Sequence, residues 1–529
     1  MKGQGPCGTA VSAVQSSKAP QIRTRQKDRT SVEPRPNGLA GRLSHVVIAS
    51  LMLWSVAAFA ADPKYKKPDV ATPQTWQSPV PWQTANPMDS LPKNAWWKIF
   101  GDSELDQYEE RAMANNQSLR AATARLAEAR AFARVTSSGL FPELDAGVSG
   151  QRQRLSGNRP TNGATITPAA VTQNVFSIPF TLSYEVDLFG RVRRSLDAAN
   201  ASLQASAADL ENVRLLVSSE LAADYFQLRE LDAEMAVVQK AINFEKSGLE
   251  LVEKRHAGGA VSGLDVAQQQ TVLDAAYAQL ALLQQQRAQF QHALAALQGL
   301  AAPEFIAPVR ALNTQPPAVP VALPSELLQR RPDVATAERQ VAAANAQIGV
   351  AKAAFYPSIF LNGGTGFQSA DIVKLLNGPS AVWSLGLSAL EPVIAGGRNR
   401  ARFEGIKATY DEDLANYRET VLMAFQQVED AIAGLNALSV ASESQLRAVS
   451  DADRSLNLAN ARYTGGLVTY LDVITAQEQV LTNERLATQI QGQRLVTAVL
   501  LIKALGGGWD SSSIAAVGVK PNLKQAIQQ

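Results

Sequence analysis

Two long stretches without proline constrain the fold of this 529-residue chain more than any other feature. The chain has 26 prolines, yet none lies between Pro179 and Pro303 or between Pro392 and Pro521. Proline breaks helix interiors, and both stretches are rich in Ala, Leu, Gln, Glu and Arg, so they predict very long helices. The first stretch also carries apolar residues at intervals of seven, as in a coiled coil. These residues are Leu196, Leu203, Leu210 and Val217.

A pair of glycines interrupts each stretch, at Gly258-Gly259 and at Gly465-Gly466, and the helical pattern then restarts. Such interruptions predict turns between antiparallel helices. A helix from about Gly190 to His256 would be about 100 Å long at ~1.5 Å per residue. Helices of this length predict an elongated, tube-like body, because a globular core does not accommodate them.

The residues before each stretch alternate between apolar and polar side chains. From Phe176 to Leu188 every second residue is apolar, which predicts a β-strand with one apolar face, long enough to cross a bilayer. Pro179 interrupts this strand and is difficult to place in it. Weaker alternation predicts three further strands, near residues 144–148, 359–367 and 383–389.

Four strands are too few to close a membrane barrel, which needs at least about eight. A barrel therefore requires several chains to share their strands. The alternative is a soluble pair of β-hairpins.

An internal repeat relates the two halves of the chain. Gly190 corresponds to Gly397 and Gly259 to Gly466, each 207 residues apart, which indicates a tandem duplication. We therefore divide the chain into five parts. They are a leader (1–60), a first structural repeat (61–302), a linker (303–324), a second structural repeat (325–508) and a C-terminal tail (509–529).

The leader contains a candidate secretion signal. Residues 43–61 are mostly apolar and end in Ala58-Phe59-Ala60, a small-x-small pattern typical of signal-peptidase sites. We expect cleavage after Ala60; an uncleaved signal anchor is the alternative. Without residues 1–60 the chain keeps 42 basic and 46 acidic residues and loses Cys7, its only cysteine. This balance gives no support for nucleic-acid binding, and the mature chain has no thiol for a disulfide.

Several motifs occur in one order along the chain. They are Trp96-Trp97, the run from Tyr184 to Arg191, the run from Leu327 to Val334, Phe355-Tyr356-Pro357-Ser358, Gly396-Gly397-Arg398 and the run from Ala504 to Trp509. Together they resemble the TolC-like outer-membrane efflux factors, in particular the NodT branch, over roughly residues 62–510. Many members carry a lipid-anchoring cysteine just before a segment like residues 62–68. This chain has none there, so a lipid anchor is not supported.

The resemblance implies an α+β membrane protein. Long antiparallel helical hairpins would form a periplasmic α-barrel, and four strands from each chain of a homotrimer would form a twelve-stranded outer-membrane β-barrel. The implied function is passive conduction of substrates delivered by an inner-membrane pump of the resistance-nodulation-division (RND) type and a periplasmic adaptor. A type I protein secretion duct and a structural trimeric coiled-coil surface protein are the alternatives.

No catalytic motif is found in the sequence, so we expect neither enzyme activity nor a cofactor. His256 and His292 lie on predicted helices, where a packed or solvated histidine is commoner than a metal ligand.

The resemblance places the adaptor contact at the two helical turns. The residues concerned are Arg255, Gly259, Val261 and Leu264 in the first repeat and Arg462, Gly466, Val468 and Leu471 in the second. A purely local role is the alternative, because glycine relieves a turn and arginine complements the end of a helix.

Asp265 and Asp472 occupy equivalent positions just after the turns. The resemblance places the periplasmic gate at Asp472, so a trimer would bring six carboxylates into an acidic constriction. Gln268 and Thr475 stand where some relatives have a second acidic residue, which predicts a less charged gate here. Alternatively, each aspartate only stabilises the first turn of its helix, by ~0.3–1 kcal/mol.

Overall fold

The computed structural model describes residues 65–70, 72–77, 95–157, 169–319, 324–514 and 516–520. Every described residue belongs to one compact unit, Lys64–Gln529. The predicted leader and its cleavage site lie outside the described residues.

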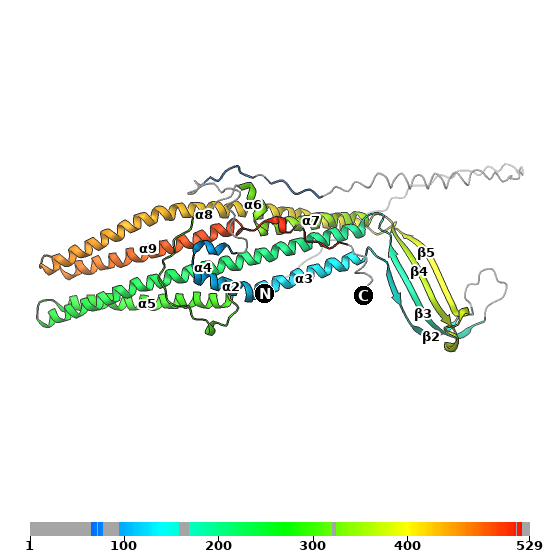
Figure 1. Ribbon diagram of the computed structural model, residues 1–529, viewed down its shortest axis with the longest axis horizontal. Coiled ribbons are helices and arrows are strands. Elements are labelled where there is room, and N and C mark those ends of the chain that lie inside the picture. Colours follow the sequence, from blue (N-terminus) through cyan, green and yellow to red (C-terminus); the bar gives the residue numbers. More distant parts are fainter. Residues whose placement is uncertain are drawn as a thin grey trace, which may run out of the picture. The chain divides into compact units, whose positions relative to one another are not determined.

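Two helical hairpins of equal size dominate this unit (Figure 1). The first consists of α4 (Arg191–Ala257) and α5 (Gly263–Leu297), and the second of α8 (Arg398–Thr464) and α9 (Tyr470–Ala504). The long arms α4 and α8 have 67 residues each, and α5 and α9 have 35 each. The prediction of long hairpins with central glycine turns is confirmed.

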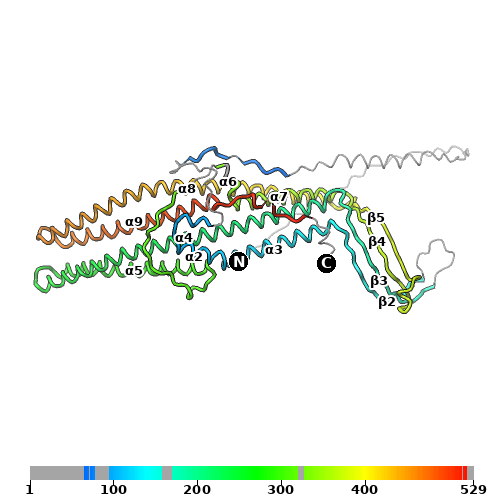
Figure 2. Tube along the Cα trace, in the orientation of Figure 1, coloured from blue at the N-terminus to red at the C-terminus, as the bar shows by residue number. Residues whose placement is uncertain are grey.

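Helices from the two halves of the chain pack side by side. α3 (Gln117–Ser138) packs on α4, α4 packs on α7 (Pro332–Ala353), and α7 packs on α8. α9 also packs along α4, although the two are far apart in the sequence (Figure 2). Among the described residues, no helix is both long and apolar enough to cross a membrane.

Short elements complete the helical part. They are α2 (Ser103–Asn115), α6 (Pro324–Arg330) and the 3-10 turns η1 (Trp96–Phe100), η2 (Ala302–Glu304), η3 (Ile372–Lys374), η4 (Gly378–Ser380) and η5 (Ser511–Ser513). The main core joins η1 and α2 to the middle of α4. In it, Trp96 donates a hydrogen bond from Nε1 to Ser218 Oγ over 3.0 Å, and Tyr225 donates to Asp102 Oδ2 over 2.8 Å.

The strands form one antiparallel sheet in the order β1-β3-β4-β5, with β2 also paired to β3. Their bounds are β1 Glu143–Ala146, β2 Ser149–Leu155, β3 Val171–Glu185, β4 Ser358–Ser369 and β5 Ala381–Leu390. β1 and β2 pair with successive parts of β3, so they are two parts of one interrupted strand. The four predicted strands are therefore present.

β3 ends three residues before its predicted end at Leu188, because Asp187 forms hydrogen bonds with the first turn of α4. The Asp187 carboxylate accepts hydrogen bonds from the backbone N–H of Arg193 at 3.0 Å and from its Nε at 3.1 Å. The pKa of Asp187 is lowered: hydrogen bonds from the backbone and side chain of Arg193 outweigh burial, which alone would raise it.

The structure also explains how β3 accommodates Pro179. The carbonyl of Pro179 accepts a hydrogen bond from Gly147 N–H at 2.9 Å, in the gap between β1 and β2. A residue's N–H and C=O point to the same side of a strand, so the missing N–H of Pro179 faces this gap and leaves no ladder partner unpaired. On the other side Pro179 pairs with Gly366, whose φ is +155°.

Replacing Gly366 by valine should abolish most of the folded, assembled protein. A Cβ there would collide with the carbonyl oxygen of Ile178, and the strain should cost about 3 kcal/mol or more. The fraction of heat-resistant oligomer on gels measures the effect. Gly386→Val is the matched control, since a Cβ at Gly386 on β5 meets no atom within 4 Å. Equal loss of oligomer in both variants would contradict this explanation.

Candidate functional site

The first hairpin tip joins α4 to α5 through a glycine in the left-handed conformation. Gly259 has φ +71°. Its N–H donates to His256 O at 2.9 Å, and the N–H of Ala260 donates to Arg255 O at 2.8 Å. These two bonds form a Schellman motif, which satisfies the last carbonyls of α4. Gly259 therefore has the local role given above as the alternative, which is to relieve the turn.

The second tip repeats this geometry between α8 and α9. Gly466 has φ +70°. Its N–H donates to Tyr463 O at 3.0 Å, and Leu467 N–H donates to Arg462 O at 2.9 Å. The two tips thus have the same backbone, as the repeat predicts.

Asp265 and Asp472 each close a capping box at the start of the returning helix. Asp265 accepts from the backbone N–H of Ser262 at 2.9 Å, and Asp472 accepts from that of Thr469 at 3.0 Å. The hydroxyls of Ser262 and Thr469 contact the same carboxylates at 2.8 and 2.7 Å. Each box satisfies otherwise unpaired donors of the first helical turn.

The carboxylates of the tips are still accessible. Asp472 is exposed and Asp265 is partly exposed. Gln268 is also partly exposed, and exposed Thr475 donates its hydroxyl to Leu471 O at 2.9 Å. The predicted acidic constriction stays a prediction, because it depends on how several chains meet.

The two tips contact each other through Arg255 and through two tyrosines, which the sequence did not single out. The guanidinium of Arg255 lies 4.7 Å from the ring centre of Tyr463, and the rings of Tyr463 and Tyr470 are 5.1 Å apart. Burial raises the pKa of Tyr470 to about 12, with Glu245 adding to the shift. A small apolar cluster around Val252 and Ile474 lies beneath these rings.

Apolar side chains are nevertheless exposed at both tips. Leu264 is 66% exposed and its counterpart Leu471 is 50% exposed, while Leu467 reaches 74%. Val261 and Val468 are partly buried, and Arg462 is exposed. Clustered exposed leucines at the end of a helical hairpin are typical of a protein-binding surface.

The sheet presents a second exposed apolar surface. Trp383, Leu385 and Leu387 occupy every second position of β5, and their side chains are 82%, 70% and 72% exposed. Among the described strands of the single chain, β5 and the interrupted strand β1/β2 are the sheet edges, each paired on one side only. Open edges and an exposed apolar face require partners, which here would be other chains and lipid.

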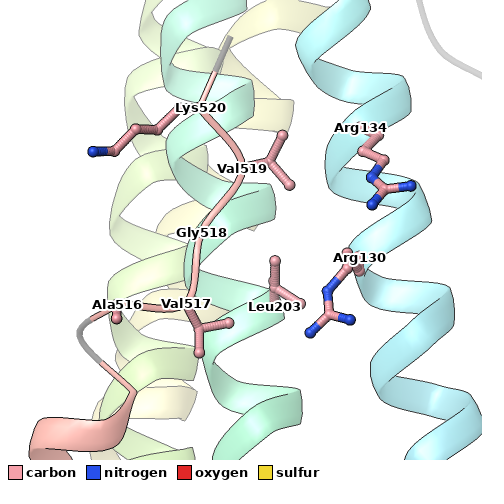
Figure 3. Close-up of a pocket in the computed structure, with 8 residues that line it drawn as sticks. All are labelled: Arg130, Arg134, Leu203, Ala516, Val517, Gly518, Val519 and Lys520. Carbon is pink, nitrogen blue, oxygen red and sulfur yellow. The ribbon is translucent and has the colours of Figure 1, made fainter. Parts of the chain in front are cut away.

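Neither surface resembles a catalytic or metal centre. In the described part of the chain, no group of three or more His, Cys, Asp or Glu side chains is placed to hold a metal ion. His256 Nδ1 lies 3.0 Å from Val261 O, inside the first tip. The hollow shown in Figure 3 lies elsewhere, beside α3.

Known proteins share this architecture. The family model described as "Outer membrane efflux protein" matches residues 109–300 and 323–507. The pyoverdine export outer membrane protein OpmQ of Pseudomonas putida strain KT2440 is 34% identical over 84% of this chain and 93% of its own. Outer membrane protein OprJ of Pseudomonas aeruginosa is 32% identical, over 88% and 96% of the two chains.

A solved structure is similar over nearly its whole length. The outer-membrane channel OprN superimposes with a TM-score of 0.78 and 28% identity, covering 85% of this chain and 99% of its own. Both halves of the sequence and the whole arrangement of helices and strands therefore agree with one family. This chain belongs to the outer membrane efflux protein family.

Proposed function

We propose that three copies of this protein form the outer-membrane duct of a tripartite efflux system. An inner-membrane pump and a periplasmic adaptor deliver the substrate, and the duct conducts it passively across the outer membrane. The family consists of outer-membrane efflux channels, which are not enzymes. We infer that this chain likewise performs no chemistry of its own and needs no cofactor.

The sheet edges carry this proposal. Each chain supplies four strands, with β1/β2 at one edge and β5 at the other. Three chains would pair these edges into a closed barrel of twelve strands, which is within the range of membrane barrels. Closure leaves no open edge, and it directs the apolar face of β5 toward lipid.

Two measurements test the duct. The mass of the detergent-solubilised protein should correspond to three chains, and the same preparation should conduct ions in planar bilayers. A stable monomer, or a trimer that forms no pores, would contradict the proposal. The structural coiled-coil alternative does not agree with the family to which the chain belongs.

The relatives favour small exported compounds over secreted proteins. OpmQ is named for pyoverdine export, and we infer a small-molecule substrate for this chain on that basis. A deletion strain tested for drug, metal and siderophore export would identify the class. Loss of a secreted protein, with all small-molecule export retained, would favour the type I secretion alternative.

We also propose that the tips form the periplasmic entrance and contact the adaptor. The exposed side chains of Leu264 and Leu471 and the equivalent turns at Gly259 and Gly466 support this assignment. Arg255 is already engaged with Tyr463. We therefore expect Arg462, which is exposed, to contribute more to the adaptor contact than Arg255.

Replacing Asp265 and Asp472 together by asparagine should roughly halve the cation preference of the open channel. The change removes six charges from a trimer, while the amide oxygen can still accept the capping hydrogen bond. Single-channel recordings and the melting temperature are measured together. The control is Asp274→Asn with Asp451→Asn, two exposed aspartates on α5 and α8 outside the tips. Unchanged selectivity with a lowered melting temperature would leave only the capping role.

A further inference from the structure

A pocket of about 340 Å³ lies between α3, α4 and the C-terminal segment 516–520 (Figure 3). The segment is held in an extended conformation by α4. The side chain of Asn200 accepts from Val519 N–H at 2.8 Å and donates to Val519 O at 3.2 Å. Gln204 donates to Val517 O at 2.9 Å. These side chains of α4 take the hydrogen-bonding place that a neighbouring β-strand would have. They fix the backbone of the segment, which forms one wall of the pocket.

The floor of the pocket is apolar. The side chains of Val517 and Val519 pack with Leu203 of α4 and Ala133 of α3. Leu203 is almost fully buried. An alkyl group entering the pocket would therefore be removed from water, which is favourable.

The rim carries two arginines from α3. Arg130 and Arg134 are one helical turn apart, so their side chains lie on the same face of the helix. Within the described ranges, neither guanidinium has a hydrogen-bond or ion-pair partner, whereas Arg125, five residues before Arg130, pairs with Asp209 at 3.0 Å. None of the eight described residues lining the pocket is acidic. Lys520 points away from the arginines (Figure 3).

We propose that this pocket binds a phosphate-bearing group attached to an alkyl or glycerol moiety. A phosphomonoester offers three charged oxygens to the two guanidinium groups, and the phosphodiester of a phospholipid offers two, of which each guanidinium can bind one. The volume is at the lower end for small-molecule sites, which suits a headgroup better than a whole lipid.

Two sources share this chemistry: the headgroup of a phospholipid and a free glycerophosphate. The lipid source rests on the proposed function, which places the sheet in the outer membrane. α3 ends at Ser138, and β1 begins at Glu143. Arg134 is therefore only a short distance along the chain from the first membrane strand, where lipid headgroups lie.

Native mass spectrometry of the delipidated full-length trimer tests the site. The probes are phosphatidylglycerol, glycerol 3-phosphate and, as a control without phosphate, diacylglycerol with the same acyl chains. We expect phosphatidylglycerol to bind and diacylglycerol not to bind. Arg130→Gln and Arg134→Gln should each weaken binding about tenfold, as for the loss of a charge-assisted hydrogen bond. Arg120→Gln, an exposed arginine on α3 that does not line the pocket, should have no effect.

The two sources are separated by competition. If glycerol 3-phosphate displaces the lipid, the pocket also recognises the free phosphate compound. If only the lipid binds, binding requires the acyl chains. Both results support the site. Phosphate-independent lipid binding, or equal affinities in Arg130→Gln, Arg134→Gln and Arg120→Gln, would overturn it. Trimers that conduct ions but bind neither phosphate probe would overturn the pocket alone and leave the proposed duct intact.

Discussion

Replacing Asp232 by alanine is expected to lower the free energy of unfolding by about 3–5 kcal/mol, because it leaves buried arginines without their counter-charge. The Asp232 side chain is fully buried. It accepts from Arg287 Nε at 2.6 Å and pairs with Arg229 Nη1 at 3.0 Å. It also accepts from the backbone N–H of Arg310 at 3.2 Å. One carboxylate therefore joins α4 to α5 and to the segment that connects the two repeats.

Thermal or denaturant unfolding of the trimer measures this loss. Glu404→Ala is the matched control, because Glu404 pairs with Arg400 at 3.0 Å while both side chains stay largely exposed. Exposed pairs contribute only about 0–1 kcal/mol. If the two variants lost similar stability, the buried charge network would not be the cause.

Replacing Glu230 by glutamine is expected to stabilise the protein at high pH and to change little at pH 5. Glu230 is buried on α4, and its pKa is raised to about 8, first by burial and then by the charge of Glu234. Arg485 of α9 donates from Nε to Glu234 at 2.7 Å. Glu230 itself accepts a hydrogen bond from Gln227 at 2.8 Å.

The sign follows from proton linkage. Below the ordinary glutamate pKa of 4.5 the folded and unfolded chains both hold the proton. Between pH 4.5 and about 8 only the unfolded chain releases it, so stability falls as pH rises through this window. At pH 8.5 the glutamine variant should be more stable by about 2–4 kcal/mol per chain.

Melting temperatures at pH 5 and pH 8.5 provide the measurement. The native protein should lose more stability between these two values than Glu230→Gln does. Glu404→Gln removes a charge from an exposed position and should keep the native pH dependence. An unchanged pH dependence in Glu230→Gln would show that Glu230 is ionised in the folded chain.

The helical architecture could be predicted because its determinants are local. Proline-free stretches and paired glycines set both ends of α4 to within one residue of the expected Gly190 and His256, and α8 ends directly before the predicted turn at Gly465-Gly466. The predicted fold class, outer-membrane location and efflux partners agree with the family. The limits of the two repeats and the constriction residues stay predictions.

Features that depend on pairing between distant segments could not be predicted in the same way. Pro179 fits because the partner strand is interrupted at Gly147 and because Gly366 lies opposite. The alternation of apolar residues carries no information about either contact. Glu230 and Glu234 are likewise buried because α9 packs on α4, and the sequence around them does not show this contact.

The contact between Arg255 and Tyr463 was missed for a related reason. Comparing the repeats identifies residues that the two copies share, but the copies differ here. Tyr463 and Tyr470 correspond to His256 and Gly263 in the first copy. Only the folded arrangement of the two hairpins brings Arg255 over the Tyr463 ring.

Because the two tips of each chain differ, the six hairpin ends of a trimer are related by threefold and not by sixfold symmetry. A trimer has six hairpin ends that share one backbone geometry, but they alternate between a form with two tyrosines and a form without them. A partner protein approaching this ring would meet two kinds of docking position in turn. An adaptor that bound every end would therefore have to tolerate both surfaces, whereas one that recognised only one kind of tip would bind in a ratio of one adaptor per channel subunit.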